Sequence, residues 1–260
     1  MSLNNPIPVV ITRPLAQARV MAPRVEALGR KAVVFPLLCI APAENPDQLR
    51  DRFRDLSVYE MVIFVSPNAV DAAFQFISGW PYGVKIGIVG EGSRLALRQY
   101  GVTDDNTTII GPRDTEKMDS EELLKSLHIE SLCGKRVLIV RGQAGRDFLS
   151  HILRSLNIEV EHLTAYHRLA PQLDAAQTVQ FLQLLDDENE WLITSSEALR
   201  NLLDLASRLG GGERVVKLQR KKFIVSHHRI AETARSLGFQ SVILTGSGDE
   251  RLLAALQSST

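Results

Sequence analysis

The run Val137-Leu138-Ile139-Val140-Arg141-Gly142 repeats an earlier run, Val9-Val10-Ile11-Thr12-Arg13-Pro14. Each run is followed by a helical stretch and then by a similar tripeptide, Ile40-Ala41-Pro42 in the first case and Leu169-Ala170-Pro171 in the second. Four adjacent apolar residues such as 137–140 are typical of a parallel β-strand that is buried on both faces of its sheet. The repeated run therefore predicts an α/β fold with two similar cores.

The repetition continues beyond these runs. Residues 62–70 match residues 191–199, and residues 88–102 match residues 224–239. A duplicated unit about half the chain long is unlike the short period of a solenoid. It predicts two similar lobes with a cleft between them, and clefts are the usual place for ligands.

The composition sets limits on size and on partners. The chain has 260 residues, of which 45% are hydrophobic, and this length suits two domains of about 130 residues each. Lys and Arg together number 30, as do Asp and Glu, so the formal net charge is zero. No nucleic-acid partner is expected, because such proteins carry a basic excess. An anionic ligand must be bound by a local group of basic side chains and backbone amides.

Cysteines and termini indicate the compartment. Cys39 and Cys133 have neither metal-ligand spacing nor the number needed for a disulfide framework, so we expect reduced thiols in a cytoplasmic protein. Residues 1–8 lack the pattern of a signal peptide. No stretch reaches the roughly 18 apolar residues of a transmembrane helix, so we expect no membrane partner. Residues 210–212, three glycines, are interpreted as a loop.

Short β-rich runs alternate with helical patterns, which predicts parallel sheets covered by helices on both faces. We expect strands at 9–12, 32–35, 61–65, 86–89, 137–140, 159–163, 191–194, 223–226 and 241–245. We expect helices near 15–28, 67–78, 92–100, 119–127, 146–156, 174–185, 196–209 and 228–237.

Two segments depart from this alternation. Residues 36–42 and 164–171 are extended, end in proline and occupy equivalent places in the two repeats. They are either irregular loops or a pair of linkers through which the chain leaves one lobe and later returns. In the second case the duplicated unit need not coincide with a lobe.

Candidate ligand-binding residues follow the strands, because ligands of open α/β sheets bind beyond the carboxyl ends of the strands. A helix that starts there attracts anions through its free N–H groups and its dipole. The alternative is that each polar residue only caps its own helix, but recurrence in both repeats favours anion binding. The six junctions are Thr12-Arg13-Pro14, Ser66-Pro67-Asn68, Gly90-Glu91-Gly92-Ser93, Arg141-Gly142-Gln143-Ala144-Gly145-Arg146, Thr194-Ser195-Ser196-Glu197 and Ser226-His227-His228-Arg229.

Other catalytic templates do not fit. Residues 87–92 are not the dinucleotide fingerprint, and neither a Walker A run nor a nucleophile elbow is present. His227 and His228 are adjacent and do not share a helix face as an i, i+4 metal pair would, so no metal is expected. An enzyme with this sequence would act mainly by shaping its ligand, with help from one acid.

Taken together, the motifs resemble the uroporphyrinogen-III synthase family from about residue 7 to residue 256. The order and spacing of the motifs carry the likeness, since each alone is weak. They are Val10-Ile11-Thr12-Arg13-Pro14, Ile63-Phe64-Val65-Ser66-Pro67-Asn68-Ala69-Val70, Ile88-Val89-Gly90 with Ser93, the extended crossing with Tyr166, Leu192-Ile193-Thr194-Ser195-Ser196, and Ala231 to Gly238.

The resemblance implies two flavodoxin-like, doubly wound parallel-sheet domains joined by a two-stranded linker, with a cleft between them. One domain would comprise residues 1–36 plus 172–260, and the other residues 46–160. Residues 37–45 and 161–171 would be the interdomain linkers. A monomer is also implied.

The resemblance further implies the reaction. The substrate would be hydroxymethylbilane, a linear tetrapyrrole with eight carboxylates, handed over by hydroxymethylbilane synthase. Loss of the terminal hydroxyl as water gives an azafulvene, ring D attacks to form a spiro intermediate, and re-closure inverts ring D. The product is uroporphyrinogen III, a precursor of haem, and no cofactor or metal is required.

Site residues are carried over in the same way. The family's linker tyrosine falls on Tyr166, which would donate a hydrogen bond or proton to the leaving hydroxyl, because a phenol is protonated at neutral pH. Its plain alternative is packing within the linker. The residues expected to bind substrate are Arg13, Ser66, Asn68, Ser93, Arg141, Arg146, Arg168, Ser195, Ser196, His227 and His228.

Two positions depart from the family's pattern. Many members have a basic or other polar residue in place of Asn68, and small hydroxyl residues in place of residues 226–229. A competing hypothesis is a non-catalytic two-lobed binding protein for an anionic small molecule. Another is a phosphate-handling α/β enzyme, which the missing phosphate loop disfavours.

Overall fold

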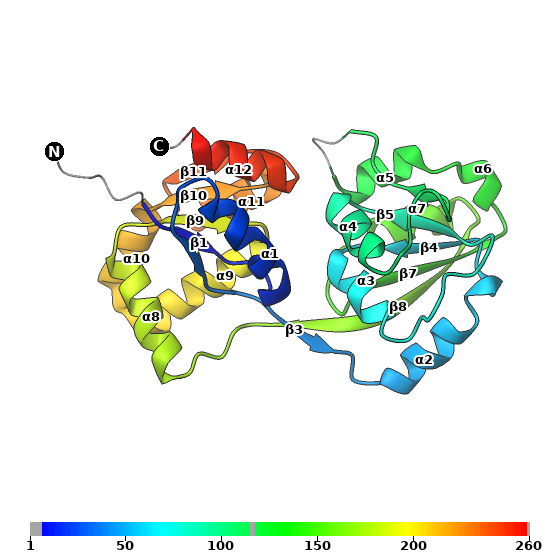
Figure 1. Ribbon diagram of the computed structural model, residues 1–260, viewed down its shortest axis with the longest axis horizontal. Coiled ribbons are helices and arrows are strands. Elements are labelled where there is room, and N and C mark those ends of the chain that lie inside the picture. Colours follow the sequence, from blue (N-terminus) through cyan, green and yellow to red (C-terminus); the bar gives the residue numbers. More distant parts are fainter. Residues whose placement is uncertain (1–6, 115–117, 259–260) are drawn as a thin grey trace. The chain divides into compact units, whose positions relative to one another are not determined.

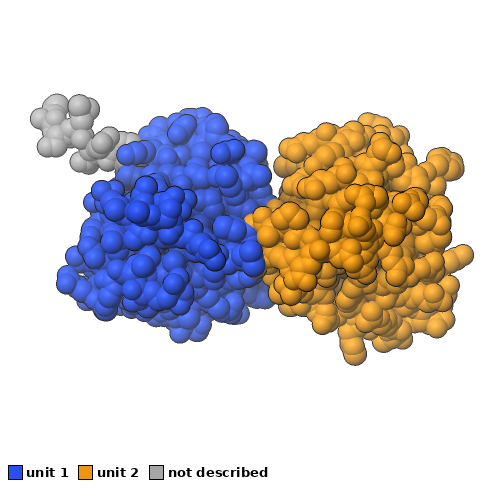
Figure 2. Space-filling view, turned by 90° about the horizontal axis from the view of Figure 1, so that it is seen from below, with its two compact units in different colours: residues 1–39, 169–260 blue, residues 40–168 orange. Residues whose placement is uncertain are grey.

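The computed structural model describes residues 7–114 and 118–258 and divides into two compact units, coloured separately in Figure 2. Unit 1 comprises Met1–Cys39 and Leu169–Thr260, and unit 2 is the continuous stretch Ile40–Arg168. The chain therefore passes from one unit to the other twice. Over the described part of the chain, no helix has the length and apolar character needed to cross a bilayer.

Unit 1 is built on a parallel sheet with the strand order β11-β10-β9-β1-β2 (Figure 1). Numbered within the unit, this is the order 2-1-3-4-5, which is that of flavodoxin-like folds. Val9–Ile11 of β1 is buried in full, as expected for a strand covered on both faces. The strands are β1 Val9–Ile11, β2 Ala32–Val34, β9 Glu190–Ile193, β10 Lys222–Val225 and β11 Ser241–Leu244.

Helices cover both faces of this sheet. Alternate strand residues Val9 and Ile11 pack with α1 (Leu15–Glu26) and α12 (Asp249–Gln257). Val10, between them, points to the opposite face, which packs against α8 (Ala175–Asp186), α9 (Ser196–Leu205), α10 (Gly211–Arg220) and α11 (His228–Ser236). Because successive side chains of a strand point to opposite faces of the sheet, each strand contributes residues to two separate cores.

Unit 2 has the sheet order β3-β8-β7-β4-β5-β6. Its strands are β3 Cys39–Pro42, β4 Met61–Phe64, β5 Lys85–Ile88, β6 Ile109–Ile110, β7 Arg136–Gly142 and β8 Glu159–Leu169. One face packs against α2 (Pro46–Arg54), α3 (Pro67–Ala73) and α4 (Glu91–Gln99), and a 3₁₀ turn, Leu56–Val58, lies in the same core. The other face packs against α5 (Ser120–Ser126), α6 (Ile129–Leu132) and α7 (Phe148–Ser155).

The sequence repeat is divided between the two units. Without β3, the order β8-β7-β4-β5-β6 of unit 2 corresponds strand for strand to β2-β1-β9-β10-β11 of unit 1. The first repeat supplies β1 and β2 to unit 1 and β4 and β5 to unit 2, and the second repeat supplies β7 and β8 to unit 2 and β9 and β10 to unit 1. Each unit therefore contains half of each repeat.

The segments expected as linkers are largely strands. Residues 161–166 continue β8, which pairs in parallel with β7 from Glu159 as far as Tyr166. The unit boundaries fall between Cys39 and Ile40, within β3, and between Arg168 and Leu169, at the end of β8. The sequence indicated that residues 164–171 are extended but not that they pair with β7, which lies elsewhere in the chain.

Several helices were not expected from the sequence. They are α2, α6, α10 and α12. The interpretation of residues 210–212 as a loop was wrong, because α10 begins at Gly211. Helix α9 ends at Leu205 and a π-helix follows over Ala206–Gly210, so the chain turns where Gly211 adopts φ 70°, a conformation that glycine tolerates best.

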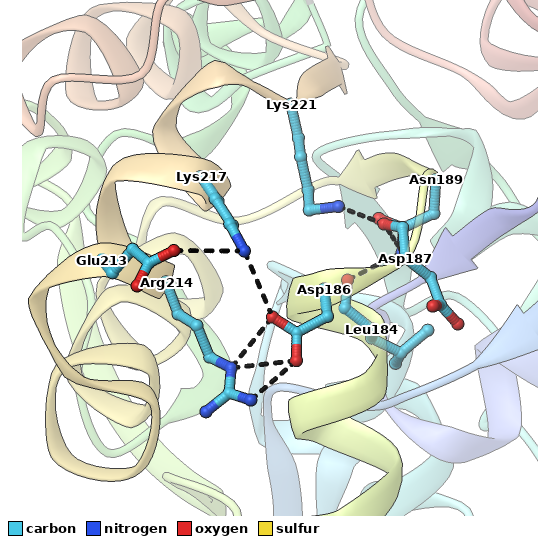
Figure 3. Close-up of polar contacts among 8 residues, drawn as sticks. All are labelled: Leu184, Asp186, Asp187, Asn189, Glu213, Arg214, Lys217 and Lys221. Atoms are coloured by element: carbon cyan, nitrogen blue, oxygen red, sulfur yellow. Dashed lines mark hydrogen bonds and ion pairs between the residues drawn. The ribbon is translucent and has the colours of Figure 1, made fainter.

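A group of polar contacts fastens α8 to α10 in unit 1 (Figure 3). Arg214 Nη2 lies 2.7 Å from Asp186 Oδ2, and Lys221 donates to the carbonyl oxygen of Asp187. Asn189 Nδ2 donates to the carbonyl oxygens of Leu184 at 2.7 Å and Asp187 at 3.1 Å, which the helix end leaves without internal donors. Burial lowers the pKa of Lys221 below its ordinary value. These contacts fix the end of α8 away from the strand ends that bear the candidate site residues.

The two segments of unit 1 are also joined by a buried ionic group. Arg30, in the N-terminal segment, lies 2.9 Å from the carboxylate of Glu190 and donates to the carbonyl oxygen of Leu256 at 3.1 Å. Lys222 Nζ lies 2.8 Å from the other carboxylate oxygen of Glu190. The side chains of Arg30 and Glu190 are only 3% and 4% exposed. Water therefore cannot solvate either charge if its partner is removed.

Arg30→Ala is expected to destabilise unit 1 by about 3 kcal/mol or more, because it leaves a buried carboxylate with one partner fewer. Urea unfolding in a Trp80→Phe background checks this, since Trp191, in the core of unit 1, is then the single tryptophan and can be excited selectively over the tyrosines. Arg19→Ala, an exposed change on α1, is the control. Equal unfolding free energies for the two variants would contradict the prediction.

Glu161 of β8 is expected to make stability depend on pH. It accepts hydrogen bonds from Arg136 and from the Tyr59 hydroxyl, and the Arg136 bond is the main reason that its pKa lies below its ordinary value. A lowered pKa stabilises the fold above about pH 4.3, the ordinary value, and this contribution disappears as pH falls through the folded value. The difference in unfolding free energy between wild type and Glu161→Gln should therefore shrink from pH 7 to pH 3. Glu159→Gln, a change at an exposed residue of the same strand, is the control.

Candidate functional site

The carboxyl ends of the strands bring the predicted junctions to one edge of each sheet. All six junctions start a helix, namely α1, α3, α4, α7, α9 and α11. In unit 2 the helices after β7 and β4, which are neighbouring strands, cover opposite faces of the sheet. In unit 1 the same holds for β1 and β9. Such switch points are where open α/β sheets bind ligands.

At the switch point of unit 2, Tyr166 reaches Ser66. The phenol oxygen of Tyr166 lies 2.9 Å from Ser66 Oγ, and the tyrosine is 4% exposed. Ser66 is the N-cap of α3, and its Oγ accepts a hydrogen bond from the backbone N–H of Ala69 at 3.2 Å. Gly142, at the end of β7, lies beneath the ring. The structure therefore brings two predicted site residues, Tyr166 and Ser66, into contact.

Two further predicted residues of unit 2 lie on nearby helices. Asn68 is the second residue of α3 and is half-buried. Ser93 lies in the first turn of α4 and is 2% exposed, so its hydroxyl is enclosed by the protein. Gly90, which precedes α4, is the N-cap residue of that helix. The role of both side chains in ligand binding stays a prediction.

Arg141 is largely enclosed by the loop that follows β7. Its guanidinium lies 2.6 Å from the carboxylate of Asp147 and lowers the pKa of that carboxyl below its ordinary value. A Cβ atom at Gly145 would lie 2.7 Å from Arg141 Nη2, so a larger residue there would require the guanidinium to shift. The Asp147 side chain is 76% exposed and that of Arg141 is 10% exposed, so the aspartate faces solvent while the guanidinium is largely enclosed.

The same loop is held by three more residues. Arg146 donates two hydrogen bonds to the carboxylate of Glu121, one of them at 2.9 Å, which raises the pKa of the arginine. Arg168 Nη2 donates to the carbonyl oxygen of Ala144 at 3.0 Å. His167 Nδ1 lies 2.6 Å from Oε1 of Gln143. Arg146 and Arg168 thus help to fix the loop in the structure, and their contact with a ligand stays a prediction.

In unit 1, Arg13 lies at the end of β1 with an acidic partner. Its Nη2 lies 2.7 Å from Asp249 at the start of α12, and Arg24 lies 3.5 Å from the same carboxylate. The preceding Thr12 donates from Oγ1 to the carbonyl oxygen of Leu192 at 2.8 Å, which ties β1 to β9 across the switch point. Arg13 is thus equivalent to Arg141, since each pairs with an aspartate that begins or precedes a helix.

The remaining predicted residues cap or join helices of unit 1. Ser195 Oγ accepts from the backbone N–H of Glu197 at 3.2 Å and caps α9. Ser196 Oγ accepts from Thr233 Oγ1 at 3.1 Å, which links α9 to α11. His227 is the N-cap of α11 through Nδ1, and its ring centroid lies 4.2 Å from that of His228. These contacts agree with the capping alternative and do not test ligand binding.

A further strand-to-helix junction, between β11 and α12, was not predicted from the sequence. Residues 245–248, Thr-Gly-Ser-Gly, follow β11 and lead into α12, whose Asp249 pairs with Arg13. Gly246 and Gly248 have φ values of 90° and 102°, which favour glycine. The glycines together with the apolar spacing of 252–256 were the signal for a helix start here. Within 7–114 and 118–258, no three His, Cys, Asp or Glu side chains are placed to hold a metal ion.

Comparisons with solved structures identify the fold. A uroporphyrinogen-III synthetase from Helicobacter pylori 26695 has a TM-score of 0.61 and 15% identity, covering 98% of this chain and 100% of that one. A mutant uroporphyrinogen III synthase from the extremely thermophilic bacterium Thermus thermophilus has a TM-score of 0.59 and 16% identity, covering 97% of both chains. At these identities the likeness concerns the fold alone, and it confirms the expected α/β class with parallel sheets.

Sequence comparisons identify the family. The family model described as uroporphyrinogen-III synthase HemD matches residues 19–252. The uroporphyrinogen-III synthase of Salmonella typhimurium (strain LT2) is 30% identical over 254 residues, covering 96% of this chain and 99% of that protein. That of Escherichia coli (strain K12) is also 30% identical, with the same coverage. The chain therefore belongs to the uroporphyrinogen-III synthase family.

Proposed function

We propose that this protein is a uroporphyrinogen-III synthase, a lyase of tetrapyrrole biosynthesis. It converts hydroxymethylbilane into uroporphyrinogen III with loss of water and inversion of ring D. Family membership over residues 19–252 supports the reaction. The observation that carries the chemistry is the 2.9 Å contact between the Tyr166 phenol and Ser66 at the switch point of unit 2.

Tyr166 is proposed as the proton donor to the leaving group. The bond between carbon and the terminal hydroxyl breaks, the electron pair goes to oxygen, and the phenolic proton completes the water molecule. The pyrrole nitrogen supplies the electron pair that forms the azafulvene. Ring D then attacks through its substituted carbon, and fragmentation and re-closure of the spiro intermediate invert the ring. Proton loss completes the product, so no net oxidation occurs.

The hydrogen bonds around Ser66 suit this role. Ser66 Oγ accepts from the backbone N–H of Ala69, so the hydroxyl hydrogen of Ser66 is free to be donated to the Tyr166 oxygen. The hydrogen of Tyr166 is then available to the substrate, and the Ser66 donor stabilises the phenolate that remains.

Basic and hydroxyl groups are proposed to bind the carboxylates of the substrate. Arg13 and Arg141 are the main candidates, because each lies at a strand end and pairs with an aspartate that an incoming carboxylate can replace. Ser66, Asn68, Ser93, Arg146, Arg168, Ser195, Ser196, His227 and His228 are the remaining candidates. The substrate requires no cofactor in this scheme.

The setting of the reaction is also proposed. The protein acts in the cytoplasm and receives hydroxymethylbilane from hydroxymethylbilane synthase. Cys39 and Cys133 are exposed free thiols, which suits a reducing compartment. The alternative, a non-catalytic binding protein for an anionic small molecule, is disfavoured by the 30% identity to synthases over nearly the whole chain.

The reaction is tested by the isomer that is formed. Enzymatically produced hydroxymethylbilane is supplied to the purified protein, and the uroporphyrinogen isomers are separated. We expect isomer III well above the spontaneous rate, whereas formation of the symmetric isomer alone, at the spontaneous rate, would reject the proposal.

Tyr166→Phe is expected to lower kcat clearly without abolishing turnover, because positioning supplies much of the rate enhancement. The variant keeps the ring and loses the hydroxyl, so KM should change little. Tyr82→Phe, which removes the hydroxyl of a fully exposed tyrosine of unit 2, is the matched control. An unchanged kcat in Tyr166→Phe would assign this tyrosine to packing.

Arg13→Ala and Arg141→Ala are expected to raise KM with a smaller effect on kcat, as losses of uniform binding do. Steady-state kinetics with enzymatically supplied substrate measure both constants. Arg19→Ala, on the exposed side of α1, provides the control for a lost surface charge. If KM is unchanged in either variant, that arginine does not contact a carboxylate of the substrate.

A further inference from the structure

We propose that Gly142 is a positioning residue, which together with a one-residue shift in the β7–β8 register places the Tyr166 phenol against Ser66. This inference rests on the proposed function of Tyr166 as a proton donor. Gly142 touches no reacting atom, and its effect on the reaction is exerted through the tyrosine ring.

The register of β8 determines the face to which Tyr166 points. Along β7 and β8 the pairs run regularly up to Arg141 with Thr164, and the next pair is Gly142 with Tyr166. Ala165 is therefore an extra residue on β8. Such irregularities re-aim the side chains that follow them and are common beside active sites.

With an unshifted register, strict alternation along β8 would place Tyr166 on the opposite face from Leu163 and Ala165. In the structure Leu163, Ala165 and Tyr166 all belong to the core that packs against α3. Ser66 caps that helix. The shift in register thus brings the phenol to the face on which its hydrogen-bond partner lies.

The phenol must also cross a strand. The sheet order is β8-β7-β4, so β7 lies between Tyr166 on β8 and Ser66 after β4. Neighbouring strands are about 4.8 Å apart, so the Tyr166 ring has to pass over β7. There it lies in the layer next to the sheet that a side chain of β7 would normally fill. A Cβ atom at Gly142 would lie 2.9 Å from Cζ, 3.0 Å from Cε2 and 3.2 Å from the hydroxyl oxygen of Tyr166. The ring occupies the space that the missing side chain leaves.

Unit 1 shows that the fold itself does not require this glycine. By the sequence repeat, Pro14 of unit 1 corresponds to Gly142, and Leu37 corresponds to Tyr166. Leu37 is fully buried in the core of unit 1, and Ser195 stands where Ser66 stands in unit 2. The glycine and the tyrosine thus occur together in one unit and are both replaced in the other.

Gly142→Ala tests the inference, because φ at Gly142 lies outside the left-handed region and the backbone accepts alanine. We expect kcat to fall about tenfold or more with little change in KM, since a misplacement near 1 Å costs up to about 10²-fold. In a Tyr166→Phe background the same substitution should change kcat by less than about twofold, because the two residues act through one hydroxyl.

A spectroscopic readout separates this inference from the proposed function. The chain has four tyrosines, so labelling with 3-fluorotyrosine gives a ¹⁹F spectrum that Tyr→Phe variants can assign. Gly142→Ala should shift the Tyr166 resonance and leave the other three in place. This measurement needs no substrate, so it stands even if isomer III is not formed.

Two glycine controls distinguish displacement of the phenol from general crowding. Gly79→Ala adds a methyl group in open space, and Gly87→Ala adds one 2.9 Å from Ile63 Cγ1, within the same sheet but away from Tyr166. Neither should shift the Tyr166 resonance. A Tyr166 resonance and a kcat that are both unchanged in Gly142→Ala would overturn the inference.

If Gly142→Ala does not fold, the double variant Gly142→Ala, Tyr166→Ala keeps the test decisive. Removal of the ring makes room for the new methyl group, so this variant should fold with the Tm of Tyr166→Ala. Failure of the double variant to fold would overturn the inference, because the glycine would then be needed for a reason other than the tyrosine.

Discussion

Parallel pairing of buried strands is the constraint on which the rest of the structure depends. Because the strands of a parallel sheet run in one direction, their carboxyl ends and the helix starts that follow them share one edge. Arg13, Ser66, Arg141 and Ser195 lie at such edges. The buried ionic group around Glu190 lies at the opposite, amino end of β9. In unit 1 the buried ionic group and the proposed ligand-binding residues therefore lie at opposite edges of the sheet.

The two units show how a repeated fold can carry different chemistry. The arginines at the ends of β1 and β7 keep the same arrangement, each with an aspartate partner. The phenol of Tyr166 has no counterpart in unit 1, where the repeat supplies a buried leucine, Leu37. The repeat thus provides two similar strand-end edges, each with an arginine and an aspartate, and the edge of unit 2 differs by the phenol of Tyr166.

The sequence was sufficient for the features that depend on local pattern. Apolar runs such as 137–140 predicted the strands, and Ser66 followed by Pro67 predicted the start of α3. Features that depend on distant partners could not be predicted. The aspartate partner of Arg13, Asp249, comes from the far end of the chain. The extra residue in β8 is visible only once its pairing with β7 is known, so the contact between Tyr166 and Ser66 was not foreseen.

Chain order and spatial order differ in this protein, and this affects its synthesis. Unit 2 is continuous, so all of its strands exist once residue 168 has left the ribosome. Unit 1 needs β9, which pairs directly with β1, and the carbonyl group of Leu256, which Arg30 binds. Strands β1 and β2 therefore lack these partners, and their apolar residues stay uncovered, until translation has passed residue 256. A nascent chain that has completed unit 2 therefore still carries β1 and β2 without β9, the partner of β1, and unpaired apolar strands of this kind are prone to aggregate.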